Sequence, residues 1–505
     1  MKKVLILLFA IFALVSCTKD DEVQGQEAAS DAVSGESLIR LTMPSEPDSL
    51  DPYLSTASDT EAVMHNIYEG LVLFDQDGAI IPGLAESWEI SDDGLEYTFH
   101  LREDVTFHNG DHFDSADAAY SYGVISGLST GKPISSRFST ITGIETTDEY
   151  TLVLKLSEPN AAFLEGTRVA IIPEGYESSA TAPVGTGPYE FVEYTPGQRI
   201  VLEKNDDYYD ESRMARIDRA EVYIMTDESA IVTALQSGQL DMAQVTGSDA
   251  EILSRNFTIY SNPQNMVCLF AMNNDFKPFD DIRVRKAMNY AVNKDNIIYG
   301  AFDGYATRLD SNFSPVMGSY YNSDVENYYP YDPGKAEALL AEAGYPDGFE
   351  FTITVPANYQ QHVNTAQIIA EDLKRVGIKA EIQLVEWGAW LEDVYSNGNY
   401  ETTIIGLTGK LDPYEILVRF VSDFRRNFFH YDNPRYDKLI KEAMVETDEE
   451  RRAELYKECQ MILTEDAACV WTCDPNLVIA ARKDLKGYKA YPLTFTDLSA
   501  LYYEE

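Results

Sequence analysis

Residues 349–385 read FEFTITVPANYQQHVNTAQIIAEDLKRVGIKAEIQLV, and this stretch decides the fold class. Its first seven residues are rich in the β-branched and aromatic types that favour strands. Residues 363–376 place apolar side chains at helical spacing, and residues 379–385 alternate between apolar and polar side chains, as a second strand does. A strand, a helix and another strand in this order are typical of an α/β layer. The stretch therefore predicts an α/β unit in the second half of the chain.

Helices are predicted on both sides of this stretch. Residues 283–291 form an amphipathic pattern behind Asp280 and Asp281, acidic residues suited to the positive N-terminal end of a helix. Residues 332–344 form another helical pattern, with a proline at the first helical position. Two more helical patterns cover residues 387–395 and 448–464. From residue 477 onward, the chain is predicted to return to short strands.

The first half of the chain predicts a mixed α+β region. Apolar and polar residues largely alternate in segments bounded by Gly, Asp or Pro, which is typical of strands. These segments are residues 38–42, 95–101, 150–156, 200–203 and 220–224. Helices are predicted at residues 61–73, 115–127 and 229–238. The first is expected to be capped by Asp59 or Thr60, and the second by Asp114 or Ser115.

The N-terminus has the pattern of a signal peptide. Lys2 and Lys3 precede an apolar run, residues 4–15, that is too short to span a membrane as a helix. Residues 1–16 are therefore predicted to be a signal peptide. No later apolar run reaches the length that a spanning helix needs.

The signal peptide ends in a motif for lipid attachment. Leu14-Val15-Ser16-Cys17 matches the lipobox of bacterial lipoproteins, so cleavage before Cys17 would expose this residue for acylation. The alternative is an incidental thiol in an ordinary signal peptide. Residues 17–37 are expected to be a lipidated cysteine followed by a flexible polar tether. The mature protein is thus predicted to be anchored outside the cytoplasmic membrane.

Composition restricts the classes of partner. The formal net charge of −45 repels nucleic acids and anionic lipid surfaces, so nucleic-acid binding is excluded. The acidity is explained by a well-solvated surface, or by long-range attraction of a cationic ligand. About 470 residues follow the tether, which is too many for one compact core, so at least two domains are expected.

Four cysteines remain after Cys17, an even number in a compartment where disulfides persist. They are Cys268, Cys459, Cys469 and Cys473. The sequence leaves open whether they form a structural disulfide or stay as buried thiols, and it does not reveal their pairing. Cys469 and Cys473 lack a second cysteine pair or nearby histidines, so a zinc site is not predicted.

No motif for enzymatic chemistry is present. Three neighbouring histidines, His100, His108 and His112, share no helical face that would place them around a metal ion. The glycine-rich residues 184–189 lack the lysine of a phosphate loop and are explained by a tight turn. A nucleophile elbow, paired zinc histidines and a Walker loop are also missing. We expect a binding protein without a cofactor, rather than an enzyme.

Three ordered groups of motifs carry a resemblance to a known family. The first comprises NIYEGL (66–71), PGLAESW (82–88), TFHLR (98–102) and FHNG (107–110). The second is PFDDIRVRKA (278–287), and the third is KAEALLAEAGY (335–345). From about residue 38 to the C-terminus, the chain resembles the oligopeptide-, dipeptide- and nickel-binding family of solute receptors that serve ATP-binding-cassette (ABC) importers.

The resemblance implies an α/β, two-lobed fold of the periplasmic-binding-protein type with mixed sheets and an extra subdomain. One lobe would comprise residues 38–262 and 477–505, with the subdomain inserted at about 73–183. The other lobe would be residues 263–476. Two crossovers, near Pro263 and Pro475, would form the hinge.

The resemblance also implies a function. The lobes would close around a small solute, a peptide or a peptide-like molecule, and deliver it to the permease subunits of an ABC importer. Alternatives are a nickel-chelate receptor or an oligosaccharide receptor of the same family, and a chemosensory receptor that closes in the same way. The protein is expected to act as a monomer.

The ligand residues follow from the family pattern. Peptide-binding members hold the ligand amine with an aspartate about four residues before a proline. In residues 404–413 that position is Gly409 or Lys410, so this clamp is missing unless Asp412 replaces it. Lys410 is instead expected to pair with an anionic ligand group, or else to be solvated.

The other candidate residues have ordinary structural alternatives. Trp387 resembles a pocket tryptophan of the family and Trp471 lies near the second crossover, but either could be a core residue. Thr56 and Ser58 match a ligand-facing loop by order alone. Arg137 is a candidate partner for a ligand carboxylate, as is the pair Arg425-Arg426, with surface ion pairs as the alternative.

Overall fold

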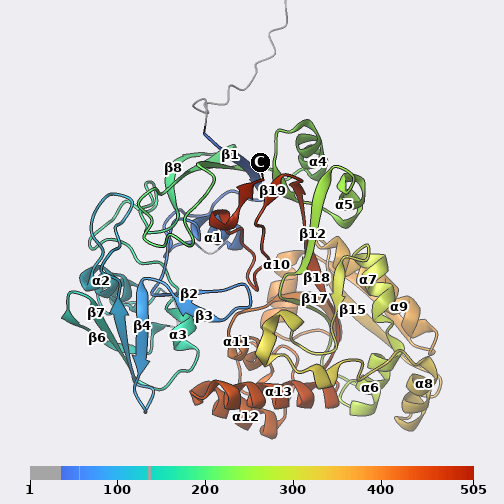
Figure 1. The fold of residues 1–505 in the computed structure, drawn as a ribbon. Helices are drawn as coiled ribbons and strands as arrows, with labels where there is room; N and C mark the ends of the chain where they lie inside the picture. The colour runs from blue at the N-terminus through green and yellow to red at the C-terminus, as the bar shows by residue number, and fades with distance from the viewer. Residues whose placement is uncertain (1–35, 56, 135–137, 505) are drawn as a thin grey trace, which may run out of the picture. The chain divides into compact units, whose positions relative to one another are not determined.

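Three large β-sheets organise the residues that this computed structural model describes, which are 36–55, 57–134 and 138–504 (Figure 1). Two sheets have four strands and the third has eight. Residues from Ser37 onward form one compact unit, so the expected second domain is not separated from the first by a break in contacts.

The first sheet combines strands from distant parts of the chain. Its order is β1 (Leu38–Met43), β10 (Arg219–Ile224), β9 (Arg199–Lys204) and β8 (Tyr189–Thr195). β1 runs parallel to β10, whereas the other pairs are antiparallel. Ile39, Leu41 and Met43 are buried and alternate with less buried residues, as the sequence pattern predicted.

The second sheet is antiparallel and carries one helix. Its order is β4 (Ala85–Ile90), β5 (Glu96–Leu101), β7 (Thr151–Leu156) and β6 (Ile141–Asp148). Helix α2 (Ser115–Ser126) packs on β6 and β7. The side chains of Asp114 and Asp117 form a capping box at its start, which confirms Asp114 as the cap.

The third sheet confirms the strand, helix and strand predicted from residues 349–385. β15 (Glu350–Pro356) lies parallel to β16 (Lys379–Val385), and α9 (Gln360–Lys374) connects them. The other strands are β11 (Met242–Gln244), β12 (Phe257–Pro263), β13 (Met266–Met272), β14 (Ala306–Arg308), β17 (Thr402–Thr408) and β18 (Cys469–Arg482).

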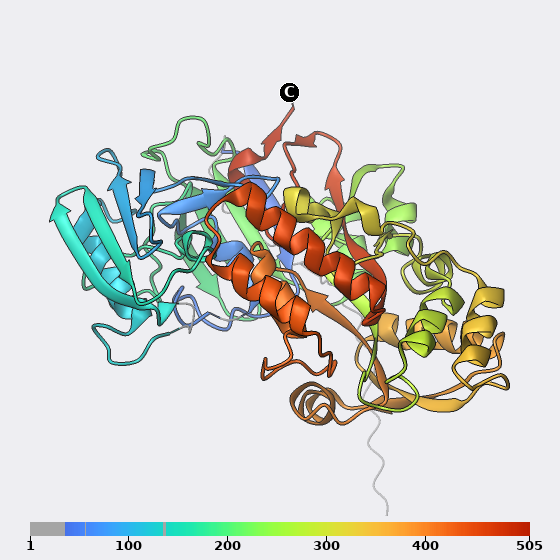
Figure 2. The same ribbon diagram turned by 90° about the horizontal axis from the view of Figure 1, so that it is seen from below.

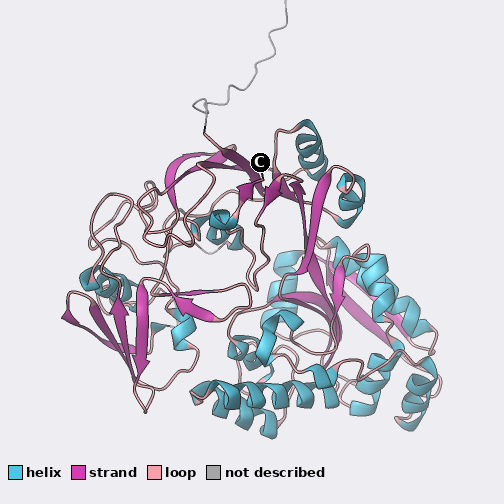
Figure 3. Cartoon of the chain, viewed as in Figure 1, coloured by secondary structure: helices cyan, strands magenta, loops and turns pink. Residues whose placement is uncertain are grey.

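Helices cover both faces of the third sheet (Figure 3). Successive residues of β13 belong to different hydrophobic cores, because side chains alternate across a strand. One core is covered by α6 (Ile282–Ala291), α7 (Lys294–Ala301), α8 (Pro333–Glu342) and α9. The other is covered by α12 (Pro434–Val445) and α13 (Glu449–Glu465), which run side by side (Figure 2).

Shorter elements connect these layers. The α-helices among them are α1 (Ser58–Met64), α3 (Phe163–Gly166), α4 (Glu228–Ser237), α5 (Gly247–Leu253), α10 (Trp387–Ala389) and α11 (Pro413–Leu417). The strands are β2 (Val72–Phe74), β3 (Ile80–Pro82), β19 (Leu485–Lys486) and β20 (Tyr502–Tyr503). A π-helix, η4 (Trp390–Ser396), follows α10. The 3-10 helices are η2 (Pro315–Tyr320), η3 (Ser323–Val325), η5 (Val418–Phe420) and η6 (Leu498–Ala500).

The predicted helix at residues 61–73 is wrong at both ends. α1 begins at Ser58, and its cap residue Ala57 makes no side-chain cap bond. Asp59 and Thr60 are not caps because they bind the preceding loop: Oδ2 of Asp59 accepts from Ser45 at 2.8 Å, and Oγ1 of Thr60 accepts from the Asp48 amide at 3.2 Å. The helix ends at Met64, and residues 72–74 instead form β2.

The prediction of short strands from residue 477 is confirmed for β19 and β20, but residues 477–482 instead belong to a long strand. β18 is a single strand of 14 residues that passes through Pro475 without a break. It pairs with β13 up to Cys473 and with β12 from Asn476 onward. Pro475 therefore stands where β18 changes neighbours, a position at which a residue without an N–H donor is tolerated.

The four cysteines of the described region are free buried thiols. Cys268 of β13 lies directly opposite Cys473 of β18 in the antiparallel ladder. Of the two alternatives that the sequence left open, this structure has the buried thiols.

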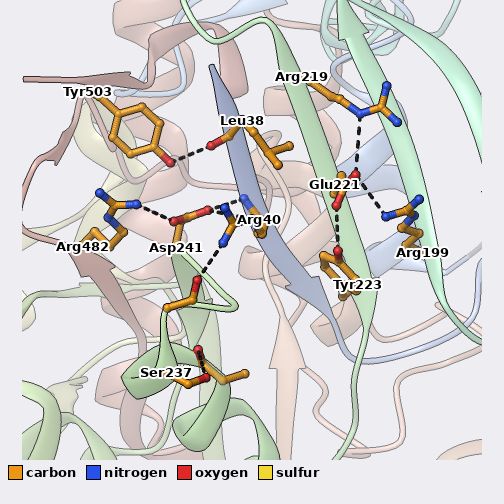
Figure 4. Close-up of polar contacts among 12 residues, drawn as sticks. Leu38, Arg40, Arg199, Arg219, Glu221, Tyr223, Ser237, Asp241, Arg482 and Tyr503 are labelled. Carbon is orange, nitrogen blue, oxygen red and sulfur yellow. Dashed lines mark hydrogen bonds and ion pairs between the residues drawn. The ribbon is translucent and has the colours of Figure 1, made fainter. Parts of the chain in front are cut away.

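Asp241 joins the first and third sheets (Figure 4). Its carboxylate is fully buried; Oδ2 accepts from the Arg40 amide at 2.8 Å, and Oδ1 accepts from Nη1 of Arg482 at 3.0 Å. Nη1 of Arg40 also donates to the Gly238 carbonyl at 2.7 Å, and the Tyr503 hydroxyl donates to the Leu38 carbonyl at 3.0 Å. These bonds connect β1, the end of β18 and the C-terminal strand β20.

We expect Asp241→Ala to lower the free energy of unfolding by about 2–4 kcal/mol, because it leaves Arg482 and a backbone amide without their buried acceptor. Urea denaturation measures the change. Asp484→Ala is the control: Asp484 also pairs with Arg482, but its side chain is 43% exposed, so the loss should stay below about 1 kcal/mol. Equal losses for the two variants would contradict the assigned role of Asp241.

Candidate functional site

A cavity of about 810 Å³ lies between two distant parts of the chain, residues 52–170 and residues 395–444. We call it the interlobe cavity. At its edge the Ala161 amide donates to the Met444 carbonyl at 3.0 Å, which joins the two parts directly. Its size falls within the range of about 300–1,000 Å³ that is typical of small-ligand sites.

The walls of the interlobe cavity combine apolar and polar groups. Its aromatic lining residues are Tyr68, Phe138, Tyr395, Tyr414 and Phe424. The hydroxyl of Thr140 also lines it and is buried without a hydrogen-bond partner in the part of the chain described. Such a lining suits a ligand with apolar side chains and polar backbone groups.

Four basic residues line the cavity, and one of them is neutralised. Nε of Arg168 donates to Glu165 at 2.7 Å. For Lys410, Arg419 and Arg426, the described residues provide no carboxylate oxygen within 4.0 Å. Nη2 of Arg419 makes a long bond of 3.5 Å to the Thr408 carbonyl, and burial lowers the pKa of its guanidinium. Among the described residues, these three cations of the cavity therefore have no carboxylate in direct contact.

Gly409 has no room for a side chain. Its amide donates to the Asn265 carbonyl at 2.6 Å, and a Cβ at this position would lie 2.3 Å from Cγ of Asn265. Atoms do not approach so closely, so an aspartate could not be built here without moving the backbone. The missing carboxylate at this position thus has a steric cause.

Asp412 does not replace that carboxylate. Its Oδ2 accepts from Nη2 of Arg452 at 2.6 Å, and its Oδ1 caps α11 by accepting from the Tyr414 amide at 2.8 Å. The residue is buried and does not line the interlobe cavity. Its charge is already matched inside the protein, so a ligand amine gains nothing from it.

The other predicted ligand residues are scattered. Trp471 is 2% exposed and packs edge-on against Phe420 in the core, so it is a core residue. Trp387 is half-buried and stacks on Trp390, with ring centroids 5.2 Å apart; it does not line the cavity. Ser58 is the first residue of α1 and does not line the cavity either. Of the predicted residues in the described region, Lys410 and Arg426 line the cavity.

Three predicted residues, Cys17, Thr56 and Arg137, lie outside the residues that the structure describes. The residues next to two of them, Ser55 and Phe138, line the interlobe cavity. Of the arginine pair, Arg426 lines the cavity and Arg425 does not.

His108 and His112 contact different partners and do not contact each other in the described hydrogen bonds. His108 bonds with the backbone of Gly185 and Gly187, and His112 bonds with the Tyr150 hydroxyl. Within the described residues there is no group of three metal-ligating side chains, and no helix is long and apolar enough to cross a membrane.

Residues 79–428 match the model of the bacterial extracellular solute-binding proteins, family 5. The chain is 31% identical over 468 residues to a glutathione-binding protein of Pectobacterium atrosepticum, with 88% of this chain and 90% of that protein covered. The chain belongs to family 5. As a member of this family, it is an extracytoplasmic solute-binding protein and not an enzyme.

Two further relatives of this family 5 protein are described as peptide-binding proteins in their names or titles. The di/tripeptide-binding protein 1 of Pseudomonas aeruginosa is 30% identical, with 88% of this chain and 90% of that protein covered. The binding protein DppA of Helicobacter pylori, solved in complex with the peptide STSA, is 28% identical with a TM-score of 0.74. That comparison covers 93% of this chain and 98% of the other, and it confirms the two-lobed α/β fold.

Sequence reasoning about this family 5 protein missed several cavity residues. Arg419, Tyr414 and Phe424 lie within 15 residues of Lys410, but no motif marked them. One available signal was charge, because basic residues that cluster in a chain with a net charge of −45 are unusual.

Asp474 connects the middle of β18 and the junction between β12 and β13 to the loop that carries Lys410. It is fully buried in β18, and its Oδ1 accepts from the amides of Gln264 and Met266 at 3.2 and 3.1 Å. Between them, Asn265 has a φ of +58° and donates from Nδ2 to the Lys410 carbonyl at 3.3 Å. Burial raises the pKa of Asp474 to about 6.

This raised pKa predicts a pH-dependent stability difference. The folded protein holds the Asp474 proton up to about pH 6, whereas an unfolded aspartate releases it near pH 3.9. The contribution of this carboxyl to the free energy of unfolding therefore falls as pH rises between these values. Relative to Asp474→Asn, the wild type should therefore lose up to about 3 kcal/mol between pH 4 and pH 7.

Urea denaturation at several pH values measures this difference. Asp423→Asn, at a side chain that is 77% exposed, serves as the control and should differ from wild type by the same amount at every pH. Parallel pH profiles for wild type and Asp474→Asn would contradict the prediction.

Proposed function

We propose that this family 5 protein captures short peptides in the interlobe cavity and delivers them to the permease subunits of an ABC importer. The observation that carries the proposal is the cavity itself. It has a volume of about 810 Å³ between two distant chain regions, with aromatic walls and charged groups of both signs. A short peptide presents the same combination, with apolar side chains, backbone amides and two charged ends.

The relatives support this ligand class. One is named for glutathione, one for di- and tripeptides, and the Helicobacter pylori protein was solved with a four-residue peptide. All of these are short peptides or molecules built like them.

Closure of two lobes would complete the binding site. In this proposal, one lobe comprises residues 38–262 and 477–505, with a subdomain at about 73–183, and the other comprises residues 263–476. The sheet pattern supports these boundaries, because β12 ends at Pro263 and β18 changes neighbours at Pro475. The cavity walls come from both lobes, so some contacts would form only in the closed state.

The protein is further proposed to act as a monomer that is tethered to the membrane through Cys17. The support for the tether is the lipobox at residues 14–17 and the polar segment that follows it. A tethered receptor stays close to the permease, which raises its effective concentration there.

Native mass spectrometry of the chain from residue 18 onward, purified without unfolding, tests the ligand class. We expect a heterogeneous set of bound short peptides, because the walls offer few groups that would select one side chain. The same protein, unfolded, washed and refolded, should be empty and should regain mass when it is given di- and tripeptides. A single metal chelate or sugar as the bound species would contradict the peptide assignment.

Metabolic labelling with palmitate tests the anchor. Cys17→Ser should abolish incorporation and release the protein from the membrane fraction, because the thiol is the acylation site. Cys459→Ser is the control, since that thiol is buried in the core and should not affect labelling. Continued labelling of Cys17→Ser would show that Cys17 is not the lipid attachment site.

A further inference from the structure

The described side chains that line the interlobe cavity differ in charge between the two chain regions. Residues 395–444 contribute Lys410, Arg419 and Arg426, together with the carboxylate of Glu415. Residues 52–170 contribute the carboxylates of Glu61 and Glu158, together with Arg168. We call the first group the basic wall and the second group the acidic wall.

Arg168 does not neutralise Glu61 and Glu158 of the acidic wall, because it already pairs with another carboxylate. Arg168 is paired with Glu165 at 2.7 Å. His65 also lines this wall, but burial lowers its pKa to about 4, so it is neutral near pH 7. Glu61 and Glu158 are exposed at the cavity, where a cationic group can reach them.

Besides Glu415, the two positions at which the sequence suggested a ligand-binding carboxylate, 409 and 412, supply none to the basic wall. Position 409 has no space for a side chain, and the charge of Asp412 is matched by Arg452 at 2.6 Å. A ligand ammonium group placed at this wall would therefore face an excess of positive charge. Placing it there would cost both its hydration and the repulsion from the cations.

The partly buried guanidinium of Arg419 points to the group that belongs at this wall. The described residues give it one long bond to a carbonyl, and no carboxylate oxygen lies within 4.0 Å. The carboxylate of Glu415 acts on this guanidinium only from a longer distance, and a ligand carboxylate in direct contact would offset the cost of its desolvation with charge-assisted hydrogen bonds. Lys410 is positioned at the same wall through the bond from Asn265 to its carbonyl at 3.3 Å.

We infer that the ligand binds with a defined polarity: its carboxylate contacts the basic wall at Lys410, Arg419 and Arg426, and its ammonium contacts Glu61 and Glu158. This inference rests on the proposed function and names its ligand class, zwitterionic peptides with both ends free. This orientation is the reverse of the one that the family pattern implies. In that pattern the position of Gly409 or Lys410 holds the ligand amine, whereas here the same wall would hold the ligand carboxylate.

Calorimetry on the refolded, ligand-free chain from residue 18 onward tests the inference. The probes are Ala-Ala-Ala and Ala-Phe-Ala, each with free ends, with a C-terminal amide, or with an N-terminal acetyl group. Amidation and acetylation should each weaken binding by about tenfold or more, because each removes one charge-assisted contact.

Variants then assign each end to a wall. Lys410→Gln and Arg426→Gln should weaken binding of the free peptides by about tenfold, yet leave the affinity for the amides unchanged. Glu61→Gln and Glu158→Gln should weaken binding of the free peptides and leave the affinity for the acetylated peptides unchanged. Arg425→Gln is the matched control, because Arg425 is exposed beside Arg426 but does not line the cavity.

The possible failures are distinguishable. If none of the free peptides binds the wild type, the peptide assignment fails, and the inference fails with it. If the free peptides bind but the basic-wall variants leave their affinity unchanged, or if those variants affect the amides equally, the polarity alone is overturned.

Discussion

The backbone ladder of β18 is the interaction on which the rest of this structure depends. This strand pairs with β13 and β14 over one part of its length and with β12 and β11 over the other. It thereby carries one continuous set of hydrogen bonds from one lobe to the other. Removing it would leave β11, β12 and β14 without a partner strand and would open one edge of β13, which keeps β17 on its other side. Each would expose backbone groups that must be paired.

Buried carboxylates fix both parts of this strand. Asp474 binds the amides of Gln264 and Met266, so the crossing in β18 is coupled to the crossing between β12 and β13. Asp241 binds Arg482 at the other end of β18 and the backbone of β1. Charge inside a protein is costly unless it is matched or hydrogen-bonded. These two carboxylates therefore restrict where the crossings and the first sheet can lie.

The cavity chemistry follows from this frame. Asn265, between the two amides that bind Asp474, takes the space beside Gly409 and holds the carbonyl of Lys410. The same connection that forms the crossing thus excludes a carboxylate from position 409 and presents a lysine to the cavity. The place of Lys410 in the basic wall is thus coupled to packing at the crossing, in a chain whose net charge is −45.

The sequence by itself determined the elements whose signals are local. The alternation in residues 38–42 and 379–385 has its predicted role, Asp114 is one of the two predicted caps, and Asp281 lies at the start of α6 as an acidic residue should, because side-chain periodicity and capping act within a few residues. The motifs also identified the family. The tertiary structure alone decided the length of β18, the end of α1, the burial of Trp471 and the pairing of Asp412 with Arg452. The length of β18, the burial of Trp471 and the pairing of Asp412 depend on partners at least 40 residues away in the chain, and local periodicity contains no information about such partners.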